Sequence, residues 1–277
     1  MRLKWIFVVV LLGGSAVFGE LDRIKYIGID EIKPGMEAYC LTVYQGTKIE
    51  KFEMEVLSVV RNSKPGMFSA GGRNVIMVMG LDERFKHTGP VQGCSGSPVY
   101  IDGRMAGALA IGFNMSKDPL YGVTPIEEML QASEIKSGES VSYLNIDHSK
   151  PFSIEAAVNA YKDLVRAEFA GGQSGMLEIP LVSSVGQSGQ EFLNEFSGGA
   201  NFRMLSAGQA GSLENLDVKL EPGGTLVVPI VSGDIAISAL GTVTEVDGDK
   251  VYGFGHPFMG QGALNLPMAN GYVHTVV

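Results

Sequence analysis

The hexapeptide Gly93-Cys94-Ser95-Gly96-Ser97-Pro98 stands directly before two short apolar runs, 99–101 and 104–111. The dipeptide Asp102-Gly103 separates these runs, and Asp-Gly between apolar segments is a strong signal of a tight β-hairpin turn. The glycines on both sides of Ser95 allow a sharp turn and leave room for a bound group near the backbone. The stretch therefore predicts a β-rich fold in which a constrained loop presents Ser95.

The hexapeptide leaves several interpretations open. Ser95 suits a nucleophile, and the amides of Gly93 and Ser95 could then stabilise an oxyanion. The adjacent Cys94 is a competing nucleophile, less favoured because Gly96 frames the serine rather than the thiol. The plain alternative is a Gly/Ser loop that only joins two strands. The order "Gly-x-Ser-Gly-x-Pro, strand, tight turn, strand" resembles that of chymotrypsin-like serine peptidases.

The composition excludes several classes of protein. With 277 residues, 45% of them hydrophobic, the chain is long and apolar enough to bury a substantial core. Its net charge is −9 and it has no basic block, which argues against nucleic acid as a partner. Two cysteines, Cys40 and Cys94, allow one disulfide but no disulfide framework and no Cys-x-x-Cys metal site. We expect neither a metal nor a cofactor.

Residues 1–19 have the pattern of a secretory signal. Arg2 and Lys4 give a positive start, Trp5–Leu12 is apolar, and small residues continue to Gly19. The apolar run is short for a transmembrane helix. We expect cleavage near Gly19 and a secreted or envelope protein. An uncleaved membrane anchor is the alternative, and both place the rest of the chain outside the cytoplasm.

Alternating or continuous apolar runs predict a mainly β protein. Strands are expected at 38–44, 49–59, 75–79, 99–101, 104–111, 177–182, 202–205, 224–230, 235–246 and 250–254. Residues 114–122 are expected to form a polar loop, and 126–132 a helix that Thr124 caps with Pro125 in its first turn. A second helix is expected from Ser153 to Val165. We predict a signal peptide at 1–19, a serine-bearing β-barrel at 24–135, a connector with a helix at 136–170, and a second, incomplete β domain at 171–277.

A serine nucleophile requires a base, and four histidines are candidates. His256 follows two glycines and precedes Pro257 at the end of a predicted strand, so a constrained backbone presents its ring. His87 lies eight residues before the serine and is the second choice. His148 belongs to the polar connector and His274 to a predicted strand, where solvation and packing are the simpler roles.

The carboxylate that would orient the base has two candidates. Asp82 ends the strand at 75–79 and lies upstream of the serine loop, although capping the next turn would explain it equally well. Asp118 lies beside Lys117 in the polar loop and is expected to be solvated.

Several runs together carry a resemblance to a known family. They are 41–43, 50–53, 86–89, 91–98, 102–104 and 122–130. On these runs, Lys33–Leu130 resembles the catalytic region of the stage IV sporulation protein B family of serine peptidases. The resemblance implies a trypsin-like double β-barrel with a Ser-His-Asp triad. The family's serine falls on Ser95 and its aspartate on Asp82, and its Gly-His motif after a hairpin is similar to 242–256, which ends in His256.

Three departures from the family accompany this resemblance. The histidine segment follows the serine segment here, whereas it precedes it in the family, but triad geometry does not depend on chain order. Cys94 stands where the family would have methionine. No PDZ-like peptide-binding module is evident, so signal-controlled cleavage is not implied.

We therefore expect a secreted or envelope serine endopeptidase that acts on proteins or peptides, itself included. Ser95 would be the nucleophile, His256 the base and Asp82 its orienting group, with the Gly93 and Ser95 amides as the oxyanion hole. The alternative is a catalytically inactive envelope protein that keeps the barrel as a binding scaffold.

Overall fold

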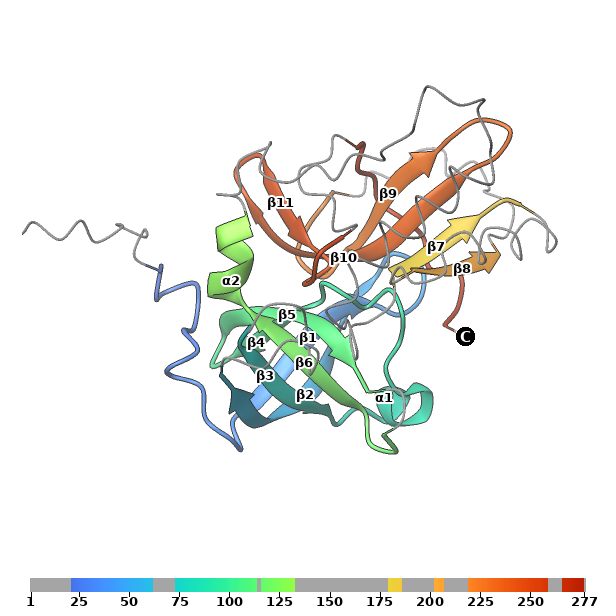
Figure 1. The fold of residues 1–277 in the computed structure, drawn as a ribbon. Coiled ribbons are helices and arrows are strands. Elements are labelled where there is room, and N and C mark those ends of the chain that lie inside the picture. Colours follow the sequence, from blue (N-terminus) through green and yellow to red (C-terminus); the bar gives the residue numbers. More distant parts are fainter. Residues whose placement is uncertain are drawn as a thin grey trace, which may run out of the picture.

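The computed structural model describes residues 21–61, 73–113, 116–132, 179–185, 202–206, 219–258 and 266–276. These residues are mainly β, which confirms the predicted class. They form a closed barrel, drawn blue to green in Figure 1, and a five-stranded sheet above it, drawn yellow to orange. The predicted signal peptide and the helix predicted from Ser153 lie outside the described residues.

Six antiparallel strands close the barrel in the order β1-β2-β3-β6-β5-β4. They are β1 (Glu37–Val43), β2 (Ile49–Val60), β3 (Val75–Gly80), β4 (Pro98–Ile101), β5 (Arg104–Gly112) and β6 (Leu120–Pro125). Pairing of β1 with β4 completes the circle. Two short helices, α1 (Glu83–Thr88) and α2 (Ile126–Gln131), flank it.

The barrel forms because its strands carry apolar side chains at every second position. On β2, Phe52, Met54 and Val56 are at most 1% exposed, whereas their neighbours face outward. Phe85 of α1 closes one end, with its ring stacked 4.6 Å from that of Phe52. The β4–β5 hairpin turns at Asp102-Gly103 with positive φ at both residues, as expected for an Asp-Gly turn.

β6 is the barrel strand that the sequence did not predict. Residues 114–122 were expected to be a loop, but Leu120 begins a strand that pairs with β3 and β5. The predicted cap is also wrong. Thr124 lies within β6, Pro125 is the N-cap of α2, and no side chain caps that helix. The Thr-Pro pattern resembles a helix start because both residues favour helix N-termini, but barrel pairing decides their conformation.

The second sheet is assembled from β7 (Ile179–Ser183), β8 (Phe202–Ser206), β9 (Thr225–Val231), β10 (Ile237–Asp247) and β11 (Lys250–Gly253). The long strand β10 pairs with β7, β9 and β11, and β8 pairs in parallel with β7. Within the described residues this sheet is open, so the predicted second barrel is not seen there. The predicted domain boundaries stay predictions.

The second sheet docks on the barrel through an apolar cluster and an ion pair. Tyr252 of β11 packs with Met105 and Ala108 of the barrel and with Ile126 and Met129 of α2. At the nearly buried Glu245 of β10, Lys25 Nζ lies 3.1 Å and Tyr26 Oη 3.3 Å from the carboxylate. Segments far apart in the sequence are thereby held together.

Candidate active site

Residues 93–98, called the serine loop below, are held against the barrel by backbone hydrogen bonds. Gly96 N–H donates to Leu109 O of β5 (2.7 Å), and Leu109 N–H donates to Ser97 O (2.9 Å). Gly93 and Gly96 have φ of +92° and +95°, a region that favours glycine. The predicted constrained loop therefore exists, and its glycines are required by its backbone conformation.

Gly96 lies where the barrel and the second sheet approach each other closely. A Cβ added there would lie 2.2 Å from Thr242 O and 2.4 Å from Phe254 N, both in the second sheet. Thr242 N–H donates to Ser95 O at 2.8 Å. The serine loop is thus sandwiched between β5 and the β10–β11 hairpin.

Residues 254–257, called the histidine loop below, follow β11. The first two of them have a left-handed backbone. Phe254 has φ of +62° and Gly255 of +69°. A Cβ on Gly255 would lie 2.7 Å from Leu109 O, so the loop also packs tightly on β5. A left-handed conformation at a bulky residue such as Phe254 is unusual and strained. This backbone path turns the ring of His256 toward the serine loop.

Ser95 and His256 meet where the serine loop of the barrel contacts the second sheet, a region called the junction below. Ser95 Oγ lies 2.5 Å from His256 Nε2, although the two residues are 161 positions apart. The other ring nitrogen, Nδ1, lies 3.0 Å from the carbonyl oxygen of Pro257. Because a carbonyl only accepts, this contact favours a proton on Nδ1 and leaves Nε2 free to accept from the hydroxyl.

A second acceptor also faces the serine hydroxyl. The carbonyl oxygen of Phe254 lies 2.5 Å from Ser95 Oγ. A hydroxyl has one proton, so Phe254 O and His256 Nε2 compete for it. The left-handed turn at Phe254 therefore brings both the base and its competitor to the serine.

Burial controls the protonation of the pair. Ser95 is 0% and His256 8% exposed. Burial lowers the pKa of His256 to about 4, because the charged ring would lack hydration in this buried position. The hydrogen bond to the Pro257 carbonyl opposes this shift, and the positive charge of Arg73 adds to it. The ring is therefore neutral at pH 7, the state in which it can accept a proton.

The amides of Gly93 and Ser95 are the predicted oxyanion hole. Within the part of the chain that the structure describes, their N–H groups have no hydrogen-bond acceptor. Their proposed role stays a prediction that a bound transition-state analogue would test.

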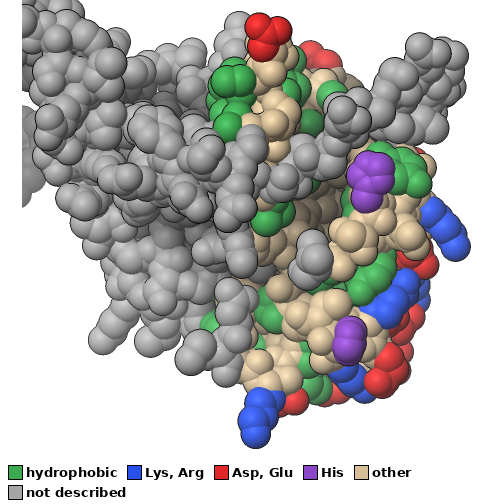
Figure 2. Space-filling view, turned by 90° about the vertical axis from the view of Figure 1, so that its right-hand side faces the viewer, with side chains coloured by type: hydrophobic (Ala, Val, Ile, Leu, Met, Phe, Trp, Pro, Cys, Tyr) green, Lys and Arg blue, Asp and Glu red, His purple; other side chains and the backbone are tan. Residues whose placement is uncertain are grey.

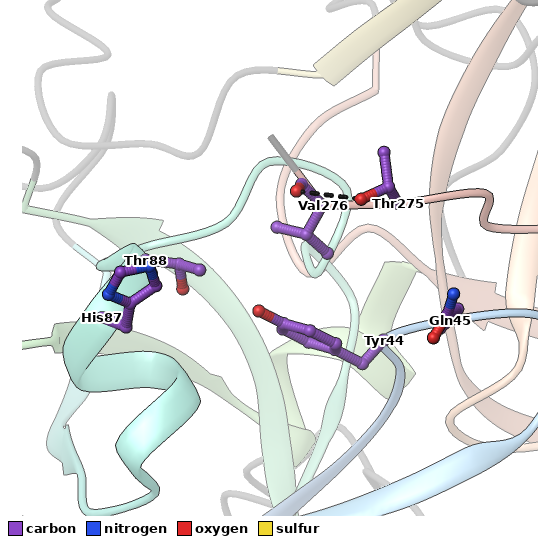
Figure 3. Close-up of a pocket in the computed structure, with 6 residues that line it drawn as sticks. All are labelled: Tyr44, Gln45, His87, Thr88, Thr275 and Val276. Carbon is purple, nitrogen blue, oxygen red and sulfur yellow. Dashed lines mark hydrogen bonds between the residues drawn. The ribbon is translucent and has the colours of Figure 1, made fainter.

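The other candidate bases lie elsewhere. His87 lines a separate pocket of about 560 Å³, together with Tyr44, Gln45, Thr88, Thr275 and Val276. Figure 3 shows His87 and Thr88 at α1, with Tyr44 between them and Gln45. His274 is exposed and its ring lies 4.9 Å from that of Tyr272, and His148 lies outside the described residues.

Asp82 is engaged with its own helix. It is the N-cap of α1, where its carboxylate accepts from the backbone N–H of Arg84 at 2.9 Å. The same side chain pairs with the Arg84 guanidinium at 3.1 Å, and this contact lowers the pKa of Asp82. The orienting role of Asp82 stays a prediction. Asp118 accepts no side-chain hydrogen bond in the described residues and its backbone N–H binds Ser116 Oγ.

The two cysteines are free thiols in the structure. Both are buried, and Cys94 Sγ donates to Val91 O at 2.7 Å. Burial raises the pKa of Cys94 to about 12. A nucleophilic cysteine needs a lowered pKa, so these surroundings favour Ser95 over Cys94 as the reactive group.

The carbonyl oxygens of Phe254 and Pro257 contact Ser95 and His256. The sequence could not identify these contacts, because both carbonyls belong to the backbone. Their only sequence signal is the Gly-Phe-Gly-His-Pro run itself, in which glycine and proline indicate a special backbone path. The same run did identify His256 as the histidine with a constrained backbone.

On the face shown in Figure 2, acidic and basic side chains lie next to one another along one flank. Among the described residues, no group of three or more His, Cys, Asp or Glu side chains is arranged to hold a metal ion.

One comparison with known proteins gives a match. Residues 20–130 match the model of the family described as SpoIVB peptidase S55. This confirms the resemblance inferred from the sequence. The matched range holds all six barrel strands, Ser95 and Asp82, but not His256. No curated protein and no solved structure matches the chain.

Proposed function

We propose, from the premise that residues 20–130 form a SpoIVB-type peptidase region, that this chain is a serine endopeptidase acting through Ser95 and His256. A peptidase family implies a protein or peptide substrate. The observation that carries the proposal is the 2.5 Å contact between Ser95 Oγ and His256 Nε2. Nucleophile and base within hydrogen-bond reach are the diagnostic arrangement for this chemistry.

The proposed reaction runs in two halves. Ser95 Oγ attacks the peptide carbonyl while its proton moves to His256 Nε2, and the amides of Gly93 and Ser95 bind the resulting oxyanion. The imidazolium then returns that proton to the leaving amine, and the C–N bond breaks to give an acyl-enzyme. Water repeats the sequence, losing its proton to Nε2 and releasing the acid and Ser95.

The Pro257 carbonyl is the proposed orienting group for the base. It accepts from Nδ1, fixes the tautomer and stabilises the imidazolium, which a carboxylate does in a triad. Asp82 remains the triad member expected from the sequence, and the variant described in the Discussion decides between the two. A trypsin-like double barrel likewise stays a prediction.

The described arrangement is a resting one. Ser95 is fully covered, and its hydroxyl also faces the Phe254 carbonyl. A substrate carbonyl reaches Oγ only after the cover over Ser95 shifts. Catalysis therefore requires that this cover shift while the contact between Ser95 and His256 is kept.

We also propose that the enzyme acts outside the cytoplasm. The support is the signal-like pattern of residues 1–19. No helix among the described residues has the length and apolar character needed to cross a bilayer. Mass measurement of the exported protein tests the proposal: a mature start near Glu20 supports it, and an intact cytoplasmic chain contradicts it.

An active-serine fluorophosphonate probe tests the peptidase assignment. The wild-type chain should become labelled, and Ser95→Ala should not, because the proposed activated hydroxyl is that of Ser95. Circular dichroism of Ser95→Ala should match the wild type, showing that the fold survives. Equal labelling of both proteins would exclude Ser95 as the nucleophile.

Two observations favour a second candidate function, an inactive binding scaffold. Ser95 is inaccessible, and within the described residues no carboxylate contacts His256. A catalytically inactive barrel of the cell envelope would keep the fold without turnover. Absence of labelling and of proteolysis in a folded wild-type chain would establish this alternative.

A further inference from the structure

Three buried threonines connect the serine loop and the histidine loop across the junction. Thr124 belongs to β6 of the barrel, and Thr242 and Thr244 belong to β10 of the second sheet. Their exposed fractions are 8%, 2% and 0%. Each hydroxyl donates to a backbone carbonyl of the other half of the molecule.

The bonds from the second sheet hold the serine loop on both sides of its nucleophile. Thr242 Oγ1 donates to Gly93 O at 3.0 Å, and Thr244 Oγ1 donates to Gly96 O at 2.7 Å. Residues two apart on a strand share one face, so β10 presents both hydroxyls to the loop. The peptide groups held in this way, 93–94 and 96–97, flank Ser95 on both sides.

The bond from the barrel holds the histidine loop. Thr124 Oγ1 donates to Gly255 O at 2.6 Å, and Gly255 directly precedes His256. Glycine has the widest backbone freedom, so without this bond the Gly255 peptide could rotate and carry the ring away. The threonine that the sequence marked as a helix cap thus holds the base.

We propose that Thr124, Thr242 and Thr244 are positioning residues whose reciprocal hydrogen bonds hold Ser95 and His256 in reactive register across the junction. This inference rests on the proposed peptidase function. None of the three side chains touches the reacting atoms, so each acts through the loop that it holds. A misplacement of about 1 Å at a reacting group can cost on the order of 100-fold in rate.

Substitution by valine and by serine tests the proposal. Valine keeps the shape of threonine but removes the donor, whereas serine keeps the donor. Thr42, a buried threonine of β1 whose hydroxyl makes no hydrogen bond to either loop among the described residues, gives the matched control Thr42→Val. The rate of fluorophosphonate labelling is measured from pH 3.5 to 8, and thermal unfolding is recorded for every variant.

We expect Thr124→Val and Thr242→Val to be labelled roughly 10- to 100-fold more slowly than the wild type. Thr124→Ser and Thr242→Ser should stay within a few-fold of it. In Thr124→Val the pH midpoint of labelling should also rise from about 4 toward the ordinary histidine value, because a released loop exposes the ring to water. Thr42→Val should keep the wild-type rate and midpoint.

The proposal is overturned if folded valine variants are labelled at the wild-type rate. It is equally overturned if the serine variants are as slow as the valine variants, since the hydroxyl would then not matter. If a valine variant does not fold, the serine and alanine variants at that position replace it, with the same comparison. Failure of the wild type itself to be labelled would instead contradict the peptidase function.

Discussion

The barrel and the second sheet are both β-structures, but their strands come from the sequence in different ways. The six barrel strands lie within residues 37–125, and each pairs with at least one strand that is adjacent to it in the sequence. Two pairings, β1 with β4 and β3 with β6, join strands that are further apart in the chain. The second sheet draws its strands from residues 179–253, and β7 pairs with β10 across a long interval. The reactive pair belongs to neither part alone, because Ser95 comes from the barrel and His256 from the sheet's last hairpin. Reactivity should therefore depend on docking of the two parts rather than on the stability of either.

The largest effect is expected from removing the base contributed by the second sheet. His256→Gln should lower hydrolysis of an unfolded protein substrate by at least about 1,000-fold, since loss of a triad histidine typically costs that much or more. His87→Gln is the matched control in the barrel and should keep wild-type activity, because its ring lies in another pocket. Equal loss in both variants would contradict the assignment of the base.

Substituting Gly96 at the junction should lower the free energy of unfolding more than substituting Gly103 at the tip of the β4–β5 hairpin. Gly96→Ala places a Cβ 2.2 Å from Thr242 O at a φ of +95°, so the sheet must move off the serine loop. We expect a loss of unfolding free energy of roughly 3 kcal/mol or more, combining the strain and the clash.

Gly103→Ala is the control for this comparison. It has φ of +73° but nothing within 4 Å of its Cβ, so only strain of about 1–2 kcal/mol is expected. Urea denaturation measures both variants. If Gly103→Ala is the more damaging of the two, the tight docking at Gly96 does not exist.

The buried histidine should make stability depend on pH. The folded-state pKa of His256 is about 4, below the unfolded value of 6.5, so between these values the unfolded chain binds more protons. Because of His256, the free energy of unfolding should rise by on the order of 3 kcal/mol between about pH 4 and 6.5. Above pH 6.5 this contribution should stay constant. Urea denaturation at pH 4.5 and 7 should show this slope in the wild type and a shallower one in His256→Gln. An equal slope in both would show that His256 is not buried.

The smallest effect is expected at Asp82. Asp82→Ala removes the N-cap of α1 and should cost about 1 kcal/mol, with little change in probe labelling. A loss of labelling on the order of 10,000-fold would instead establish the orienting role that the sequence predicted, since that is the scale on which a triad aspartate acts.

The contrast between the two parts also explains how much the sequence could predict. Alternation and the Asp-Gly turn located most barrel strands, because their pairing is local. β6 was missed because Leu120–Pro125 is short and ends in a Thr-Pro pair that also suits a helix start. The parallel pairing of β7 with β8 could not be foreseen, since no local signal specifies a partner strand.

The site was predictable to a similar degree. Ser95 and His256 were proposed as partners because glycines and proline constrain their loops, and the structure places the two side chains in contact, while their catalytic roles stay a prediction. The carbonyls of Phe254 and Pro257 were missed because backbone acceptors have no residue signature. Thr242 and Thr244 lie two apart on β10, which indicates polar contacts on one face of the strand but does not specify which loop they hold.

The central claim is that Ser95 is activated by His256 across the junction. Its most direct test is mass spectrometry of the full chain after treatment with a fluorophosphonate, with the adduct mapped to a peptide. If His256 activates Ser95, we expect a single adduct on the peptide containing Ser95 in the wild type, and no adduct in folded His256→Gln. An adduct on any other residue, or one on Ser95 that persists unchanged in His256→Gln, would contradict it.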